Sequence, residues 1–151
     1  MSFQFRFESL LQVRRRERDE AGAACGQASE AISRIDQQLL ETDQLRMSLR
    51  KEGHASLTGN IQVDNLLSKG RYDMQLEAEI NSLRETHAQL TAELARRHAT
   101  LVAAESEVKK LERLQENEQA EYEIESRRRE QLESDDAATR RYLLQRHNKV
   151  Q

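Results

Sequence analysis

The sequence contains no proline and no tryptophan, and it has one cysteine among 151 residues. Because proline interrupts helices, its complete absence permits helices of unusual length. A single cysteine, Cys25, excludes an internal disulfide. Only 36% of the residues are hydrophobic and 34% are charged, which leaves too little apolar material for a compact multilayer core. The composition therefore favours a helical rod.

Strong net charge and long hydrophobic runs are also missing. A net charge of −3 removes the simplest electrostatic reason to expect nucleic acid or an anionic membrane as a partner. The apolar runs are far shorter than the ~20 residues that a membrane-spanning helix needs. The N-terminus shows no basic segment followed by a hydrophobic one. We therefore expect a soluble, cytoplasmic protein that binds no nucleic acid.

Sequence signatures of catalysis are absent as well. There is no P-loop, glycine-rich dinucleotide turn, zinc-finger cysteine spacing or nucleophile elbow. The four histidines are never three or four residues apart, so no helix face offers two of them to one metal ion. We expect no enzyme activity, no cofactor, no metal site and no direct small-molecule substrate.

Two stretches carry a seven-residue register in which mainly apolar residues alternate at spacings of four and three, the pattern of a coiled-coil seam. The first seam runs through Phe7, Leu11, Arg14, Arg18, Ala21, Cys25, Ala28, Ile32, Ile35, Leu39, Thr42, Arg46 and Leu49. The second runs through Leu76, Ile80, Leu83, His87, Leu90, Leu94, Arg97, Leu101, Ala104, Val108 and Leu111. The second spacing continues to Leu143, but most of its later positions are polar.

These seams predict an all-α protein, an antiparallel two-helix coiled-coil hairpin in which the second helix is longer. We expect one domain over 1–151, with the first helix over about 3–51, a turn at about 52–60 or extending to about 70, and the second helix from about 61 or 71 to about 146. Folding back near residue 56 would lay the N-terminus beside residues between about 105 and 115. The second helix would then be unpaired from about residue 112.

Three groups of residues are candidate partner contacts. All three phenylalanines, Phe3, Phe5 and Phe7, lie within five residues and form either a contact surface or a hydrophobic plug that seals the open end of the hairpin. After the chain folds back, a run of arginines near the start should form a basic collar with Arg97, although a solvated face is the simpler alternative. The unpaired end of the second helix could enter a groove in another protein, or remain a mobile charged tail. The arginines concerned are Arg14, Arg15, Arg18 and Arg97 in the collar, and Arg127, Arg128 and Arg129 in the unpaired end.

Two regions of the sequence also resemble a known family. The opening Phe3-Gln-Phe-Arg-Phe-Glu-Ser-Leu-Leu11, with Val13-Arg-Arg-Arg-Glu-Arg18, resembles the start of FliJ proteins, the coiled-coil components of the bacterial flagellar type III export apparatus. Glu107-Val-Lys-Lys-Leu-Glu-Arg-Leu114 and Arg127-Arg-Arg-Glu-Gln-Leu-Glu-Ser-Asp-Asp136 resemble stretches near the family's end, with Ser134-Asp135-Asp136 replacing the more usual Leu-Asp-Glu.

The resemblance implies a role in flagellum biogenesis and motility. It implies a central stalk that binds the export ATPase ring, contacts the membrane export gate and escorts export chaperones, at the cytoplasmic side of the inner membrane. The chain would act as a monomer or weak dimer. An alternative is a structural coiled-coil dimerisation protein without an ATPase partner, which a stable dimer lost on removing residues 112–151 would favour. Salt-sensitive binding to DNA or anionic vesicles would instead support a surface binder that uses the basic collar.

Overall fold

The computed structural model describes residues 2–149, apart from the side chain of Ser56. It contains two helices, α1 (Glu8–Ser56) and α2 (Val63–Asn148), of 49 and 86 residues. The described residues form no strand. The predicted class is confirmed: the protein is all-α, an antiparallel two-helix coiled-coil hairpin whose second helix is the longer.

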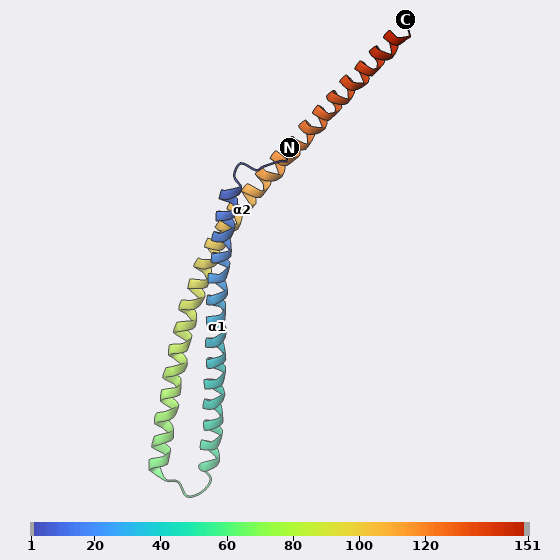
Figure 1. Ribbon diagram of the computed structural model, residues 1–151. Coiled ribbons are helices and arrows are strands. Elements are labelled where there is room, and N and C mark those ends of the chain that lie inside the picture. The colour runs from blue at the N-terminus through green and yellow to red at the C-terminus, as the bar shows by residue number, and fades with distance from the viewer. Residues whose placement is uncertain (1, 150–151) are drawn as a thin grey trace. The chain divides into compact units, whose positions relative to one another are not determined.

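The chain divides into two compact units. Unit 1 comprises Met1–Arg16 and Glu105–Gln151, and unit 2 comprises Glu17–Ala104. In unit 2 the two helices run side by side and are joined at one end by the loop 57–62 (Figure 1). Both units therefore combine a part of α1 with a part of α2.

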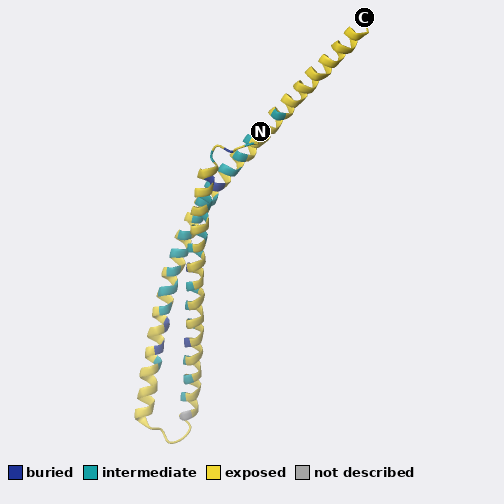
Figure 2. Ribbon diagram, viewed as in Figure 1, coloured by how far each residue is buried: buried dark blue, intermediate teal, exposed yellow. Residues whose placement is uncertain are grey.

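The predicted seam is the buried stripe of unit 2. Every seam position from Arg18 to Leu49 and from Leu76 to Ala104 is buried or half-buried, and these positions face the neighbouring helix (Figure 2). Ala28, Thr42, Leu76 and Ile80 are the buried members. Because α-helical side chains at alternating spacings of three and four residues share one face, the seven-residue register puts all of them at the interface.

The loop between the helices is short. Thr58 donates a side-chain hydrogen bond to the carbonyl oxygen of Ala55 at 2.9 Å, and the Leu57 amide donates to the carbonyl oxygen of His54 at 3.3 Å. Gly59 has a backbone φ of 151°, a value that residues other than glycine rarely adopt. The sequence argument placed the turn at about 52–60 or as far as about 70, whereas α1 continues to Ser56 and α2 is already helical at Val63.

Unit 1 begins with a segment that is not helical. Residues 2–7 precede α1, which the sequence argument expected to begin near residue 3. An extended chain advances about 3.3 Å per residue against 1.5 Å in a helix, so this segment reaches further along α2 than a helix of equal length. Its Phe3 ring lies 5.7 Å from the ring of Tyr122, beyond the residues 105–115 that the fold-back argument indicated.

Candidate partner-binding site

Unit 1 contains an aromatic and aliphatic cluster. Phe5, Leu11 and Val108 form its buried core, with exposed fractions of 8%, 0% and 2%, and Phe3, Phe7 and Leu111 pack against them. The rings of Phe5 and Phe7 meet edge to face, with their centroids 5.8 Å apart. This packing has the form of the hydrophobic plug that the sequence analysis set against a contact surface.

The phenylalanines differ in what they offer a partner. Phe5 is buried, whereas Phe3 and Phe7 are half-buried and keep part of their rings at the surface. The guanidinium carbon of Arg6 lies 4.4 Å from the ring centre of Phe7, a cation–π arrangement. A partner can therefore contact the exposed parts of the Phe3 and Phe7 rings in unit 1, but not the buried ring of Phe5.

The first arginines of α1 face carboxylates of α2 within unit 1. Arg15 donates a hydrogen bond to Glu112 at 3.0 Å, and both side chains are little more than one third exposed. Glu107 accepts a hydrogen bond from Lys110 at 2.8 Å, which lowers its pKa, with a smaller electrostatic contribution from the half-buried Arg14. These contacts hold the start of α1 against α2.

Arg97 is bound in unit 2. Its guanidinium donates to the carbonyl oxygen of Ala24 in α1 at 2.8 Å and to Glu93 on its own helix at 3.0 Å. Hydrogen bonds from Arg96 first, and then from Arg97, lower the pKa of Glu93. An arginine on the seam is thus retained by a hydrogen bond to the backbone of the opposite helix rather than by apolar packing.

The proposed basic collar is divided between the units. Arg18 is half-buried in unit 2 and pairs with the adjacent Asp19 at 3.0 Å, while Arg14 and Arg15 belong to unit 1. Their assembly with Arg97 into one surface stays a prediction. The geometry within each unit is that of paired arginines with partly exposed side chains.

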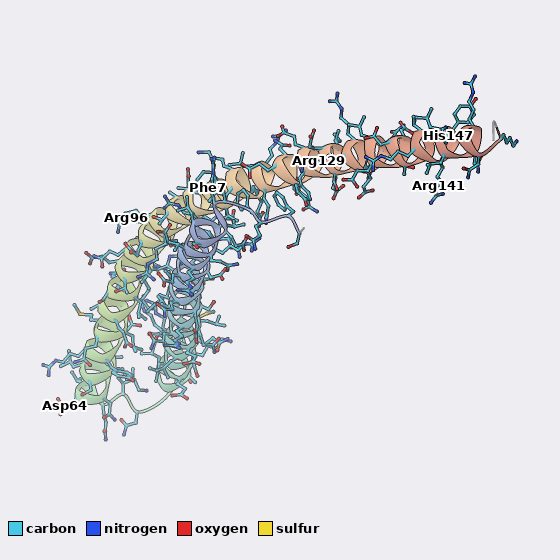
Figure 3. The ribbon with its side chains drawn as sticks, turned by 45° about the horizontal axis from the view of Figure 1, so that its top comes forward. Phe7, Asp64, Arg96, Arg129, Arg141 and His147 are labelled. Carbon is cyan, nitrogen blue, oxygen red and sulfur yellow. The ribbon has the colours of Figure 1, made fainter. Side chains whose placement is uncertain are left out.

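The C-terminal part of α2 is the most exposed part of unit 1. We name residues 127–149 the tail; all of its side chains are exposed (Figure 2). Arg127 lies 3.9 Å from Glu123 and Arg129 lies 3.5 Å from Glu125, both pairs one helical turn apart. Arg129 and Arg141 project outward from the helix (Figure 3). The tail exposes charged side chains and some apolar side chains. Among the described residues, no other element covers them.

One hollow was not anticipated from the sequence. Beside the loop in unit 2 lies an open hollow of about 600 Å³. Its signal was present in the sequence as apolar residues off the seam, such as Leu57 and Leu66, which are 44% and 46% exposed. The sequence leaves open a turn that extends to about residue 70, whereas α2 is helical from Val63 onward. The hollow is lined by Leu49, Arg50, Gly53, His54, Leu57, Leu66, Lys69, Gly70, Tyr72 and Asp73.

Within residues 2–149 no three His, Cys, Asp or Glu side chains gather in a way that could hold a metal ion. His87 on the seam lies 3.1 Å from the carboxylate of Asp36, a pair across the two helices of unit 2. Neither helix, over the described residues, has a stretch apolar and long enough to span a membrane.

Comparison with known proteins identifies related chains. Residues 3–147 match the family described as Flagellar FliJ protein. A protein of Bacillus subtilis (strain 168) named Flagellar FliJ protein is 21% identical over 147 residues, which cover 97% of this chain and all of that protein. No solved structure was found to match the chain.

Proposed function

This chain belongs to the FliJ family, whose members are flagellar, export-related proteins and not enzymes, and we propose that it serves as a central stalk of the export ATPase ring. In this proposal it binds the ring with unit 1, links the ring to the membrane export gate and escorts export chaperones. It works in the cytoplasm, peripheral to the inner membrane. Its contribution is positional, since it promotes ring assembly and couples ATP turnover to the gate.

One observation carries the proposal. The last part of α2 in unit 1 is a single exposed helix, and it begins where the start of the chain no longer covers α2. Up to Tyr122, α2 is covered by the start of the chain, and from Arg127 onward each described side chain is exposed. A single helix is about 10–12 Å wide with its side chains, a width that suits a ring lumen. Exposed side chains on all sides allow contacts with several ring subunits at once.

The residues proposed to contact the ring are those that the packing of unit 1 leaves accessible. Phe3 and Phe7 offer apolar ring surface, and the arginines offer charge that acidic loops of the ring subunits can bind. Arg128 is a strong candidate because, in the described part of the chain, it makes no ion pair. The proposed set from unit 1 is Phe3, Phe7, Arg14, Arg15, Arg127, Arg128 and Arg129, and Arg18 and Arg97 of unit 2 are proposed with it.

We assign the gate contact to the loop end of unit 2. If the tail and the N-terminal segment are occupied by the ring, the apolar hollow beside loop 57–62 is the other surface suited to a protein partner. The exposed Leu57 and Leu66 supply apolar area, and Lys69 with Asp73 supplies polar groups of its lining. A gate protein would bury these side chains on binding.

The proposal is tested by ATPase activity and ring assembly with purified ATPase from the same organism. Wild-type chain should raise both, and Arg14→Glu/Arg18→Glu should reduce the effect at least about tenfold if each reversal costs a charge-assisted contact of about 1.5–3 kcal/mol. The matched control is Arg34→Glu, since Arg34 is exposed and, among residues 2–149, pairs only with Glu30 on its own helix. No stimulation by wild type, or equal stimulation by the double variant, would rule the stalk role out.

A further inference from the structure

The tail carries apolar side chains that nothing in the described structure covers. Leu132 is 59% exposed, and Tyr142, Leu143 and Leu144 are 62%, 58% and 66% exposed. A single helix with no packed face is marginally stable in water. An association would therefore bury exposed apolar area of the tail and stabilise its helix.

After the three arginines at 127–129, the charges of the tail are arranged in two blocks. The first block, 130–136, is acidic, and the second, 140–149, is basic. In the described part of the chain, Glu133, Asp136 and Arg140 take part in no ion pair. A segment whose first half is acidic and whose second half is basic is complementary to a copy of itself that runs in the opposite direction. The members are Glu130, Glu133, Asp135 and Asp136 in the first block and Arg140, Arg141, Arg146 and Lys149 in the second.

The seven-residue register supports the same pairing. It continues into the tail at Arg129, Leu132, Asp136, Thr139, Leu143 and Arg146. A two-fold axis between Ala137 and Ala138 maps this row onto itself, so that Leu132 of one copy faces Leu143 of the other. Beside the row, Glu133 of one copy faces Arg140 of the other, and the symmetry makes this pair twice.

We propose that the tail is a self-association surface on which a second copy of this chain binds antiparallel. The two Leu132–Leu143 layers form its apolar part, on either side of a polar middle made by Asp136 and Thr139, and the two Glu133–Arg140 pairs fix its direction and register. Arg129 faces Arg146 at each end of the contact, and this like-charge repulsion keeps the dimer weak and reversible. The interface lies entirely on the tail of each copy, so a copy whose tail occupies the proposed ring site does not form this dimer at the same time.

The experiment uses two single charge reversals on the purified full-length chain. In dimers of the Glu133→Arg variant the introduced guanidinium would face Arg140, and in dimers of the Arg140→Glu variant the facing groups would both be acidic. Sedimentation equilibrium should show each variant dimerising at least about tenfold more weakly than wild type. An equimolar mixture should dimerise to within about threefold of wild type, because both facing pairs are then opposite in charge.

A matched control separates this contact from a general charge effect. Arg141 is adjacent to Arg140 and equally exposed, but it lies on the side of the helix opposite the seam. Arg141→Glu should leave dimerisation unchanged. Equal weakening by Arg141→Glu, or a mixture of the two reversals that fails to recover, would overturn the proposal.

The antiparallel orientation of the two tails is tested by measuring the distance between one label on each copy. A spin label on Asn148→Cys in a Cys25→Ser background should give a separation of about 30 Å across an antiparallel dimer, from 21 residues of helix at 1.5 Å each. A parallel dimer would bring the labels to about a helix diameter, 10–12 Å. That short distance, or a wild-type chain that stays monomeric at every concentration, would refute the inference. Because these measurements use the chain alone, they are independent of the ATPase assays.

Discussion

Arg46 of α1 holds both carboxylate oxygens of Asp73 of α2, with hydrogen bonds of 2.9 and 3.2 Å. Arg50, one turn further along α1, donates to the same two oxygens at 3.2 and 3.3 Å. Two arginines thus converge on one carboxylate near the loop of unit 2. A bidentate contact of this kind fixes the register of the two helices as well as their separation.

This cluster gives the protein a pH dependence at low pH. The hydrogen bonds from Arg46 first, and then from Arg50, lower the pKa of Asp73 from 3.8 to about 2. Because the folded pKa is depressed, the contribution to stability is complete above the unfolded pKa, near 3.8, and is lost as the pH falls towards 2. Thermal unfolding of Asp73→Asn should vary less than wild type between about pH 5 and pH 2. Parallel curves for the two proteins would contradict this assignment.

The buried leucine at the start of α1 should dominate the stability of unit 1. Leu11 is fully buried against Val108, so Leu11→Ala should lower the free energy of unfolding by about 2–5 kcal/mol. The neighbouring Leu10 is 41% exposed, and Leu10→Ala should cost much less. Urea unfolding of the two variants is the measurement. Losses of equal size would show that the cluster is not packed as described.

Two adjacent arginines of α2 should also differ in how much they contribute to the free energy of unfolding. Arg97 donates to a carbonyl oxygen of the opposite helix, whereas the side chain of Arg96 bonds to Glu93 one turn away. We expect Arg97→Ala to lower the free energy of unfolding by about 1–2 kcal/mol, since it removes a contact between the helices. Arg96→Ala should stay within about 0.5 kcal/mol of wild type. The comparison fails if the two substitutions have the same effect.

Two glycines should respond to alanine with opposite signs. Gly70 lies inside α2, and a Cβ there would meet nothing within 4 Å, so Gly70→Ala should stabilise the helix by about 0.5–1 kcal/mol. Gly59 in the loop has a φ of 151°, which alanine adopts only with strain, so Gly59→Ala should destabilise the protein. Melting temperatures of both variants, each against wild type, check the two signs. A rise for Gly59→Ala would mean that the loop adopts another conformation.

The fold was predictable from the sequence because its buried positions follow one simple rule. A row of residues spaced by four and three can only face a partner helix, and the residues so identified are the covered ones from Phe7 to Leu49 and from Leu76 to Tyr122. The antiparallel arrangement follows from the short connection between two seams of the same kind.

The N-terminal segment was harder to place. Phe3, Phe5 and Phe7 alternate with polar residues, a period of two that suits an extended chain, whereas the predicted first helix begins near residue 3. That alternation was the available signal. It explains why the segment leaves the helical path and reaches Tyr122.

The individual polar contacts between the helices could not be derived from the sequence. Whether Arg46 meets Asp73 depends on where the chain folds back, and a shift of a few residues in the loop would pair it with a different side chain. The sequence argument centred the fold-back near residue 56, while the loop occupies 57–62. The charged contact residues remain predictions for the same reason, since partners and not packing determine which of them matter.

The separation in sequence between contacting residues suggests an order of folding. Arg46 and Asp73 are 27 positions apart, whereas Leu11 and Val108 close a loop of nearly the whole hairpin. Since short loops close at a lower entropic cost, we expect pairing to start beside loop 57–62 and to zip towards the chain ends. The aromatic opening therefore leaves the ribosome well before Val108 and is the last part of the hairpin to be covered. During synthesis it is exposed to chaperones and proteases until Val108 has emerged.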